Sequence, residues 1–228
     1  MRKNIVVLSG AGISAESGIK TFRDADGLWE GHDVMTVASP QGWQENPKLV
    51  LDFYNQRRRQ LLNVIPNKAH DTLVKFEKIF NVIIVTQNVD DLHERAGSSN
   101  VLHLHGELLK AQSTQNASLI YPCLKDIYLR DVCELGSQLR PYIVWFGEDV
   151  PKLNEAIAKV MNADIIIIVG TSMQVYPAAG LVSFVSNNTP IYYIDPNPAV
   201  NDALACADNV TLIKKNASQG IMELAEQL

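Results

Sequence analysis

The sequence predicts a doubly wound α/β fold, because short apolar strands alternate with helical stretches along most of its 228 residues. Four runs rich in Ile and Val are apolar on both faces, as is typical of buried parallel strands. They cover residues 4–9, 81–87, 163–171 and 190–195. In such a sheet we expect ligands at the carboxyl ends of the strands.

The stretches between these strands have helical periodicity, and two segments interrupt the alternation. Helices are predicted over residues 47–63, 67–79, 152–162, 177–187 and 218–227. Residues 17–46 contain several Gly and no clear strand, so we expect a long loop with short helices. Residues 110–140 are polar, hold two of the three Cys, and have the character of a small insertion.

Composition narrows the class of protein. A net charge of -5 argues against a general nucleic-acid binder, and 46% hydrophobic residues are ordinary for a globular protein. No apolar run is long enough to span a bilayer. From the charge and the hydropathy together, neither nucleic acid nor a membrane is a predicted partner. The opening MRKNIVVLSGAG is too short for the core of a signal peptide, which predicts a cytoplasmic location. Three Cys are too few to suggest a disulfide framework. The sequence does not indicate the oligomeric state.

A glycine-rich loop directly follows the first strand. Gly10, Gly12 and Ala15 fit the pattern G-x-G-x-x-A, in which small residues let the backbone approach a pyrophosphate. A purely structural tight turn is the alternative. Residues 19–40 lack the second strand, ending in an acidic residue, that a conventional dehydrogenase would show. The loop therefore indicates a dinucleotide site with chemistry other than simple hydride transfer.

The segment DFYNQRRRQL places a tyrosine just before three arginines. At helical spacing Tyr54 and Arg57 share a face, where a phenol and a guanidinium could together hold a small carboxylate. A solvated helix face is the alternative for this pair. It is the preferred interpretation for Arg58 and Arg59.

Five blocks, in their order along the chain, resemble the sirtuins, the NAD-dependent protein lysine deacylases. They are GAGISAESGIKTFRDADGLW (10–29), TQNVDDLHERAG (86–97), LHGE (104–107), LRPYIVWFGE (139–148) and VGTSMQVYPAAG (169–180). The resemblance covers most of the chain. It is closest to the small bacterial and mitochondrial class that also carries a Tyr-x-x-Arg pair.

This resemblance implies a Rossmann-like large lobe and a small lobe formed by insertions. The large lobe would comprise about 1–16, 80–109 and 141–228, and the small lobe about 17–79 and 110–140. NAD would lie between the lobes, and an acyl-lysine protein would enter as an extended peptide. The acyl oxygen would attack C1′ of the nicotinamide ribose, giving nicotinamide, free lysine and O-acyl-ADP-ribose.

The resemblance also assigns residues to NAD. The phosphate loop, the nicotinamide end, the ribose-binding residues and the adenosine end would be formed by Gly10, Ala11, Gly12, Ile13, Ser14, Ala15, Thr21, Phe22, Arg23, Trp29, Gln87, Asn88, Asp90, Gly170, Thr171, Ser172, Asp195 and Ala217. Asp90 suits the carboxamide, because a carboxylate accepts hydrogen bonds from its NH₂. Taken alone, the QNVD segment could equally be a strand-to-helix turn.

His105 is the candidate general base, since a neutral imidazole can take a proton from a ribose hydroxyl at neutral pH. The neighbouring His103 is the rival. The family pattern puts the base immediately before Gly, which selects His105, and we expect His103 to pack or cap. The remaining histidines carry no comparable motif.

The substrate peptide would be held by strand addition between two edge segments. Backbone near Gly147, Glu148 and Val175 would bind it, and Val144 and Phe146 would wall the acyl-lysine tunnel. Tyr54 and Arg57 would read an acidic acyl group. The predicted activity is thus deacylation favouring succinyl, malonyl or glutaryl lysine over acetyl-lysine. The alternatives are a plain deacetylase, a non-catalytic NAD or ADP-ribose sensor, and a mono-ADP-ribosyl transferase.

Two positions depart from the family pattern. Sirtuins usually carry two Cys-x-x-Cys pairs that bind structural zinc, but here Val132 and Leu135 stand where the second pair would fall. We therefore expect no zinc, and a small apolar core in its place formed by Leu119, Ile120, Leu124, Ile127, Val132 and Leu135. The second departure is Tyr193 and Asp195, where the family often has Asn-x-Glu beside the adenosine ribose.

Overall fold

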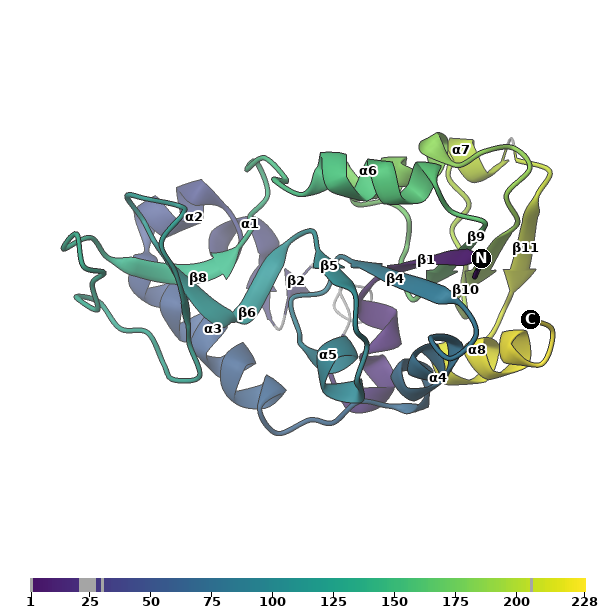
Figure 1. Ribbon diagram of the computed structural model, residues 1–228. Helices are drawn as coiled ribbons and strands as arrows, with labels where there is room; N and C mark the ends of the chain where they lie inside the picture. The colour runs from purple at the N-terminus through teal and green to yellow at the C-terminus, as the bar shows by residue number, and fades with distance from the viewer. Residues whose placement is uncertain (1, 21–27, 30, 206) are drawn as a thin grey trace.

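The computed structural model describes residues 2–20, 28–29, 31–205 and 207–228, and it confirms the α/β fold with a Rossmann-like parallel sheet (Figure 1). Six parallel strands lie in the order β11-β10-β9-β1-β4-β5. Their bounds are β1 Asn4–Ser9, β4 Asn81–Thr86, β5 Val101–His103, β9 Ile165–Val169, β10 Ile191–Ile194 and β11 Val210–Ile213. β1 is central and pairs with both β4 and β9.

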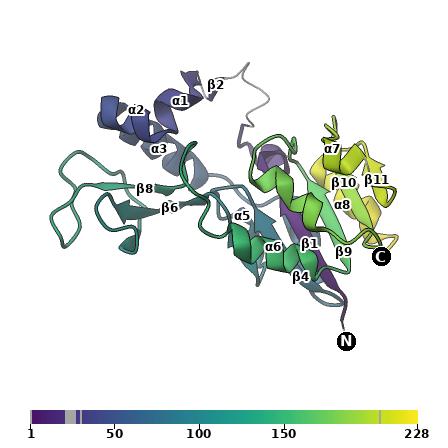
Figure 2. The same ribbon diagram turned by 90° about the horizontal axis from the view of Figure 1, so that it is seen from above.

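The strands are apolar on both faces because helices cover both sides of the sheet, as Figure 1 shows; Figure 2 looks down on one of these sides. Alternate residues of β1 point to opposite faces. Val6 and Leu8 pack with α6 (Leu153–Met161) and the 3₁₀ segment η4 (Ala178–Phe184). Ile5 and Val7 pack with α4 (Lys68–Phe76) and α8 (Ala217–Ala225). Two separate cores therefore hold the sheet.

A second sheet and three helices form the other end of the molecule (Figure 1). The antiparallel strands β7 (Ile120–Pro122), β6 (Gly106–Ser113) and β8 (Leu139–Ile143) pair in that order. Around them lie α1 (Val34–Val37), α2 (Pro40–Glu45) and α3 (Pro47–Leu61). The shorter elements are η1 Ala11–Ile13, η2 Ala15–Ser17, β2 Leu28–Trp29, β3 His32–Asp33, α5 Leu92–Ala96 and α7 Asp202–Ala205.

α3 carries the tyrosine and arginines singled out above, and its start is defined by local chemistry. Asn46 is the N-cap, and its side chain accepts a hydrogen bond from the Leu49 N–H. Pro47 follows at the first helical position, where the missing N–H costs nothing. The inner face of the helix buries Phe53, Tyr54 and Arg58.

Several expected elements differ from those observed. Residues 178–184 form a 3₁₀ segment instead of an α-helix, and β5 and β11 lie outside the four predicted strands. The expected lobe boundaries at 109 and 141 fall inside β6 and β8, and the division into two lobes stays a prediction. Among the described residues, no helix is both long enough and apolar enough to cross a bilayer.

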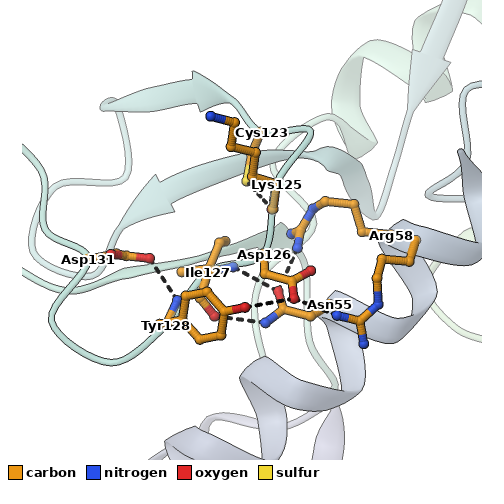
Figure 3. Close-up of polar contacts among 9 residues, drawn as sticks. Asn55, Arg58, Cys123, Lys125, Asp126, Ile127, Tyr128 and Asp131 are labelled. Atoms are coloured by element: carbon orange, nitrogen blue, oxygen red, sulfur yellow. Dashed lines mark hydrogen bonds and ion pairs between the residues drawn. The ribbon is translucent and has the colours of Figure 1, made fainter.

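The expected apolar core in the insertion is wrong. Ile127 is buried, but Leu124, Val132 and Leu135 expose 61%, 51% and 56% of their surface. Polar contacts hold the insertion instead (Figure 3). The Asn55 side chain pairs with both backbone groups of Ile127, donating from Nδ2 to the carbonyl at 2.8 Å and accepting from the N–H at 2.9 Å. The loop therefore docks on α3 through the Asn55 side chain, beside the apolar packing of Ile127 with Leu51.

Arg58 also corrects an expectation, because it is fully buried rather than solvated. Its Nε donates to the Leu108 carbonyl at 3.1 Å. Its Nη1 donates to Asn55 Oδ1 at 2.8 Å, as Figure 3 shows. Desolvation lowers the pKa of this guanidinium. Arg59 is exposed as expected and forms an ion pair with Asp126.

Candidate active site

A cavity of about 1030 Å³ opens at the carboxyl ends of β1, β4, β9 and β10, where the fold class places ligands. Residues of α3 and of the segment after β8 complete its wall. The predicted site residues that line it are Gly10, Ala11, Gly12, Ala15, Tyr54, Arg57, Gln87, Asn88, Asp90, His105, Val144, Phe146, Gly147, Glu148, Gly170, Thr171, Ser172, Val175, Asp195 and Ala217.

The remaining predicted residues fall into two groups. Ile13 packs in the core beneath the sheet, and Ser14 is buried just behind the cavity. Thr21, Phe22 and Arg23 lie outside the described residues, as does the side chain of Trp29. Sequence reasoning missed further lining residues, among them Gln60, Leu108 and Trp145.

The glycine loop is packed against the loop that follows β9. The Gly10 N–H donates to the Val169 carbonyl at 3.1 Å, and the Gly12 N–H donates to the Gly170 carbonyl at 2.7 Å. A Cβ on Gly12 would lie 2.6 Å from the Gly170 Cα, which is too close for any side chain. The glycines thus allow two loops that face one cavity to meet backbone to backbone.

A buried hydrogen-bond chain connects the glycine loop to the segment after β4. Asn88 Nδ2 donates to Ser14 Oγ at 3.1 Å, and Ser14 Oγ donates to Asp90 Oδ2 at 2.9 Å. Burial raises the pKa of Asp90, while hydrogen bonds from Leu92 and Ser14 act in the opposite direction. The chain thus fixes an amide and a carboxyl group at one corner of the cavity.

His105 has the geometry of a base. Its Nδ1 lies 3.0 Å from the Gln87 carbonyl oxygen, which can only accept, so Nδ1 carries the hydrogen. Nε2 then holds the free lone pair of the neutral ring. Burial lowers the pKa of His105, which keeps the imidazole neutral near pH 7. His103, the rival, is absent from the cavity wall and is bonded at both ring nitrogens.

Tyr54 and Arg57 reach the same cavity as His105. Tyr54 is fully buried, and the Trp145 indole Nε1 donates to its hydroxyl oxygen at 3.1 Å. Desolvation raises the pKa of Tyr54, so the phenol stays protonated. The Arg57 guanidinium carbon lies 5.0 Å from the centroid of the Phe53 ring. A phenol and a cation therefore stand at one wall.

The segment after β8 is anchored by an internal ion pair. Arg140 donates to both carboxylate oxygens of Glu148, at 2.7 and 3.0 Å, and its guanidinium carbon lies 3.3 Å from the Trp145 ring centroid. The Trp145 N–H also donates to Glu148 at 2.7 Å. Glu148 was expected as a peptide-binding position, and its carboxylate holds this segment in shape. The only sequence signal for the role of Trp145 was its position inside the VWFGE motif.

Two residues line the other end of the cavity. Asp195 begins the loop after β10, and Ala217 is the first residue of α8. Asp195 is buried, and its Oδ1 accepts from the Asn197 N–H at 2.8 Å. Tyr193 is also buried and donates to the Thr171 carbonyl at 2.9 Å. In place of Asn-x-Glu, Asp195 therefore provides a carboxylate at the cavity, and the Tyr193 phenol forms a hydrogen bond to the loop after β9.

This cavity fits NAD, because the backbone of a glycine loop, a buried carboxyl group and a neutral histidine all line it. Residues 10–177 match the family model described as Sir2 family. The chain is 60% identical over 226 residues to an NAD-dependent protein deacylase of Helicobacter pylori, covering 99% of this chain and 97% of that protein. A deacylase of the same description from Bacteroides thetaiotaomicron is 49% identical over 232 residues, covering 99% and 98%.

Solved structures agree with these matches. A complex of a Sir2 homolog with NAD superposes with a TM-score of 0.86 at 38% identity, covering 99% of this chain and 89% of that chain. A mutant Sir2 homologue bound to ADP-ribose has a TM-score of 0.88 at 38% identity, covering 99% and 91%. The chain therefore belongs to the Sir2 family of NAD-dependent protein deacylases.

Proposed function

We propose that this deacylase favours lysine acyl groups that end in a carboxylate, such as succinyl, malonyl and glutaryl, over acetyl. The observation that carries the proposal is that Tyr54 and Arg57 line the same cavity as His105. Arg57 supplies a cation, and Tyr54 supplies a neutral phenol because burial raises its pKa. An acetyl group offers these two side chains no partner, whereas a terminal carboxylate can bond to both.

The expected size of this preference follows from the chemistry. A hydrogen bond to a charged group contributes about 1.5–3 kcal/mol, hence roughly ten- to a hundredfold in selectivity. Arg57 is only partly buried, so solvent screening puts its contribution at the lower end. The preference should therefore be measurable without excluding deacetylation.

The residues divide the reaction between them. NAD, when bound, supplies the C1′ carbon that accepts the acyl oxygen and the nicotinamide that leaves. His105 removes a proton from a ribose hydroxyl through Nε2, while the Gln87 carbonyl holds the ring. Asn88 and Asp90 bind the carboxamide, and the glycine loop binds the phosphates. The peptide backbone pairs with the segments around Gly147 and Val175 by strand addition.

We also propose that the chain works without structural zinc. Val132 and Leu135, which cannot bind metal, stand at the positions of the second cysteine pair. Cys133 is instead bonded to two hydroxyl groups, with its Sγ 3.4 Å from Ser113 Oγ and 3.1 Å from Ser137 Oγ. These contacts join the end of β6 to the turn that precedes β8.

The test compares kcat/KM for acetyl-lysine and succinyl-lysine on one peptide, with saturating NAD, for wild type, Arg57→Met and Arg59→Met. We expect wild type to favour the succinyl peptide and Arg57→Met to lose that preference while keeping deacetylation. Arg59→Met is the matched control, because this arginine is exposed and pairs with Asp126. A wild type that favours acetyl and is unaffected by Arg57→Met would identify a plain deacetylase. No release of nicotinamide from either peptide would indicate a sensor.

A further inference from the structure

His103 lies at the end of β5 with 4% of its side chain exposed, and both of its ring nitrogens are bonded. Nδ1 lies 3.0 Å from the Asn88 backbone oxygen, and Nε2 lies 2.7 Å from Glu94 Oε1. A carbonyl oxygen and a carboxylate can only accept hydrogen bonds. Both nitrogens must therefore donate, which requires the imidazolium form.

The surrounding charges agree with this protonation state. Burial lowers the pKa of His103, but the hydrogen bond and charge of Glu94 outweigh it, and Glu107 on β6 adds to the upward shift. The hydrogen bond and charge of His103 in turn hold the pKa of Glu94 below its ordinary value, against the effect of burial. His93, the other histidine nearby, is buried and has a pKa well below its ordinary value, so it adds no second cation.

The cation is joined to the corner of the cavity in two ways. Its Nδ1–H fixes the Asn88 carbonyl, and the Asn88 side chain continues through Ser14 to Asp90. Its charge also acts on Asp90 directly and opposes the upward pKa shift that burial imposes on that carboxyl group. His103 thus holds the backbone of the segment after β4 and places a positive charge near its buried carboxyl group.

We propose that His103 is a charged positioning residue: held as an imidazolium by Glu94, it fixes the Asn88 segment and places a positive charge beside the buried Asp90 carboxyl group, at the nicotinamide end of NAD. The proposal rests on the roles proposed above for Asn88 and Asp90. Loss of the His103 proton removes a donor that the structure needs. Because the carboxylate of Glu94 retains the Nε2 hydrogen, the lone pair of Nδ1 would then face the Asn88 carbonyl, and the segment would shift.

The protonation state can be measured directly. Nitrogen-15 chemical shifts of the histidine side chains, assigned with His103→Gln, distinguish protonated from unprotonated ring nitrogens. We expect His103 to be protonated at both nitrogens near neutral pH. His105 is the internal reference and should show an unprotonated Nε2. An unprotonated nitrogen in His103 under these conditions would overturn the proposal.

The functional consequence is tested with Glu94→Gln, whose amide can still bond to Nε2 as acceptor or donor but lacks the negative charge that stabilises the imidazolium. We expect kcat/KM for NAD to fall by about tenfold, the worth of a charge-assisted hydrogen bond, while KM for an acetyl-peptide changes less than roughly twofold. The loss should shrink as the pH is lowered, because His103 regains its proton. Glu223→Gln is the matched control, since it removes the carboxylate of a separate ion pair with Lys215.

Two results would contradict the role of His103. One is a kcat/KM for NAD in Glu94→Gln with the magnitude and pH dependence of wild type. The other is an equal loss for NAD and peptide together with a lowered Tm, which would indicate a purely structural pair. If the proposed acyl preference is wrong, only the relative rates with the two acyl-peptides change. That outcome differs from both results above, which concern kcat/KM for NAD.

Discussion

The indole Nε1 of Trp145 donates a hydrogen bond to the hydroxyl oxygen of Tyr54 at 3.1 Å, and both side chains are buried at the cavity wall. An indole N–H can only donate, so Tyr54 is the acceptor in this bond and its own hydrogen is directed elsewhere. Trp145 is itself fixed by Arg140 and Glu148. The hydrogen bond therefore orients the phenol as a donor.

Replacing Trp145 with Phe should weaken the preference for acidic acyl groups. Phe keeps a ring for Arg140 but removes the N–H that orients Tyr54, so kcat/KM for succinyl-peptide should fall by about tenfold. Deacetylation should change much less. Trp43→Phe is the control, because the Trp43 ring packs in the same region, 5.7 Å from that of Trp145, while the bond to Tyr54 comes from Trp145. Equal losses with both peptides would show that the bond only supports packing.

His105→Ala should abolish turnover while leaving the protein folded, because among the described residues that line the cavity there is no second imidazole to replace its Nε2. Nicotinamide release from an acetyl-peptide measures turnover, and retained NAD binding by calorimetry shows an intact cavity. In wild type the base must be neutral, and burial lowers the pKa of His105 below its ordinary value. The rate should therefore hold at neutral pH and fall at a pH below about 6.5. Full activity in the variant would refute the assignment.

The parallel sheet could be predicted from sequence because its strands are buried on both faces, which leaves continuous Ile and Val runs. The structure of the insertion could not be predicted, because β6 and β8 are far apart in the sequence and apolar residues such as Leu135 stay exposed. The burial of Arg58 had a local signal: it stands four residues after Tyr54, on the same helix face. The bonds of Tyr54 to Trp145 and of Asn55 to Ile127 had none, because they join residues 91 and 72 positions apart.

Asn55→Ala should destabilise the protein strongly. It leaves the N–H and carbonyl of Ile127 without partners and removes the acceptor of Arg58 Nη1, in a buried position. We expect a loss of about 3 kcal/mol in the free energy of unfolding. Asn63→Ala is the control, since Asn63 is exposed at the end of α3, and it should cost less than about 0.5 kcal/mol. Similar denaturation midpoints for both variants would contradict this docking role.

Purified protein should contain far less than one zinc per chain, and chelators should leave its Tm unchanged. Among the described residues no group of three or more His, Cys, Asp or Glu side chains is placed to hold a metal. Elemental analysis together with thermal melts in the presence and absence of a chelator makes this measurement. Stoichiometric zinc, or a chelator-dependent fall in Tm, would show that the insertion binds metal through ligands not identified above.

Stability should decline as the pH falls below about 6.5, because His70 and His93 are buried in the neutral form. Burial lowers the pKa of His70 to about 4 and that of His93 well below its ordinary value. Between the pKa of the unfolded chain and that of the folded chain, the unfolded state binds more protons. Each group therefore removes up to about 1.4 kcal/mol per pH unit as the pH falls through this window.

His70→Gln should flatten that decline. His70 accepts the Asn67 N–H at the start of α4, and Gln can keep this bond as the third residue of a capping box. The titration is lost together with the buried ring contact to His93, so the variant should melt somewhat below wild type at neutral pH, but its Tm should fall less steeply towards pH 5. His32→Gln, at a partly exposed position, is the control and should follow wild type. Parallel Tm curves for wild type and His70→Gln would mean that other groups cause the acid sensitivity.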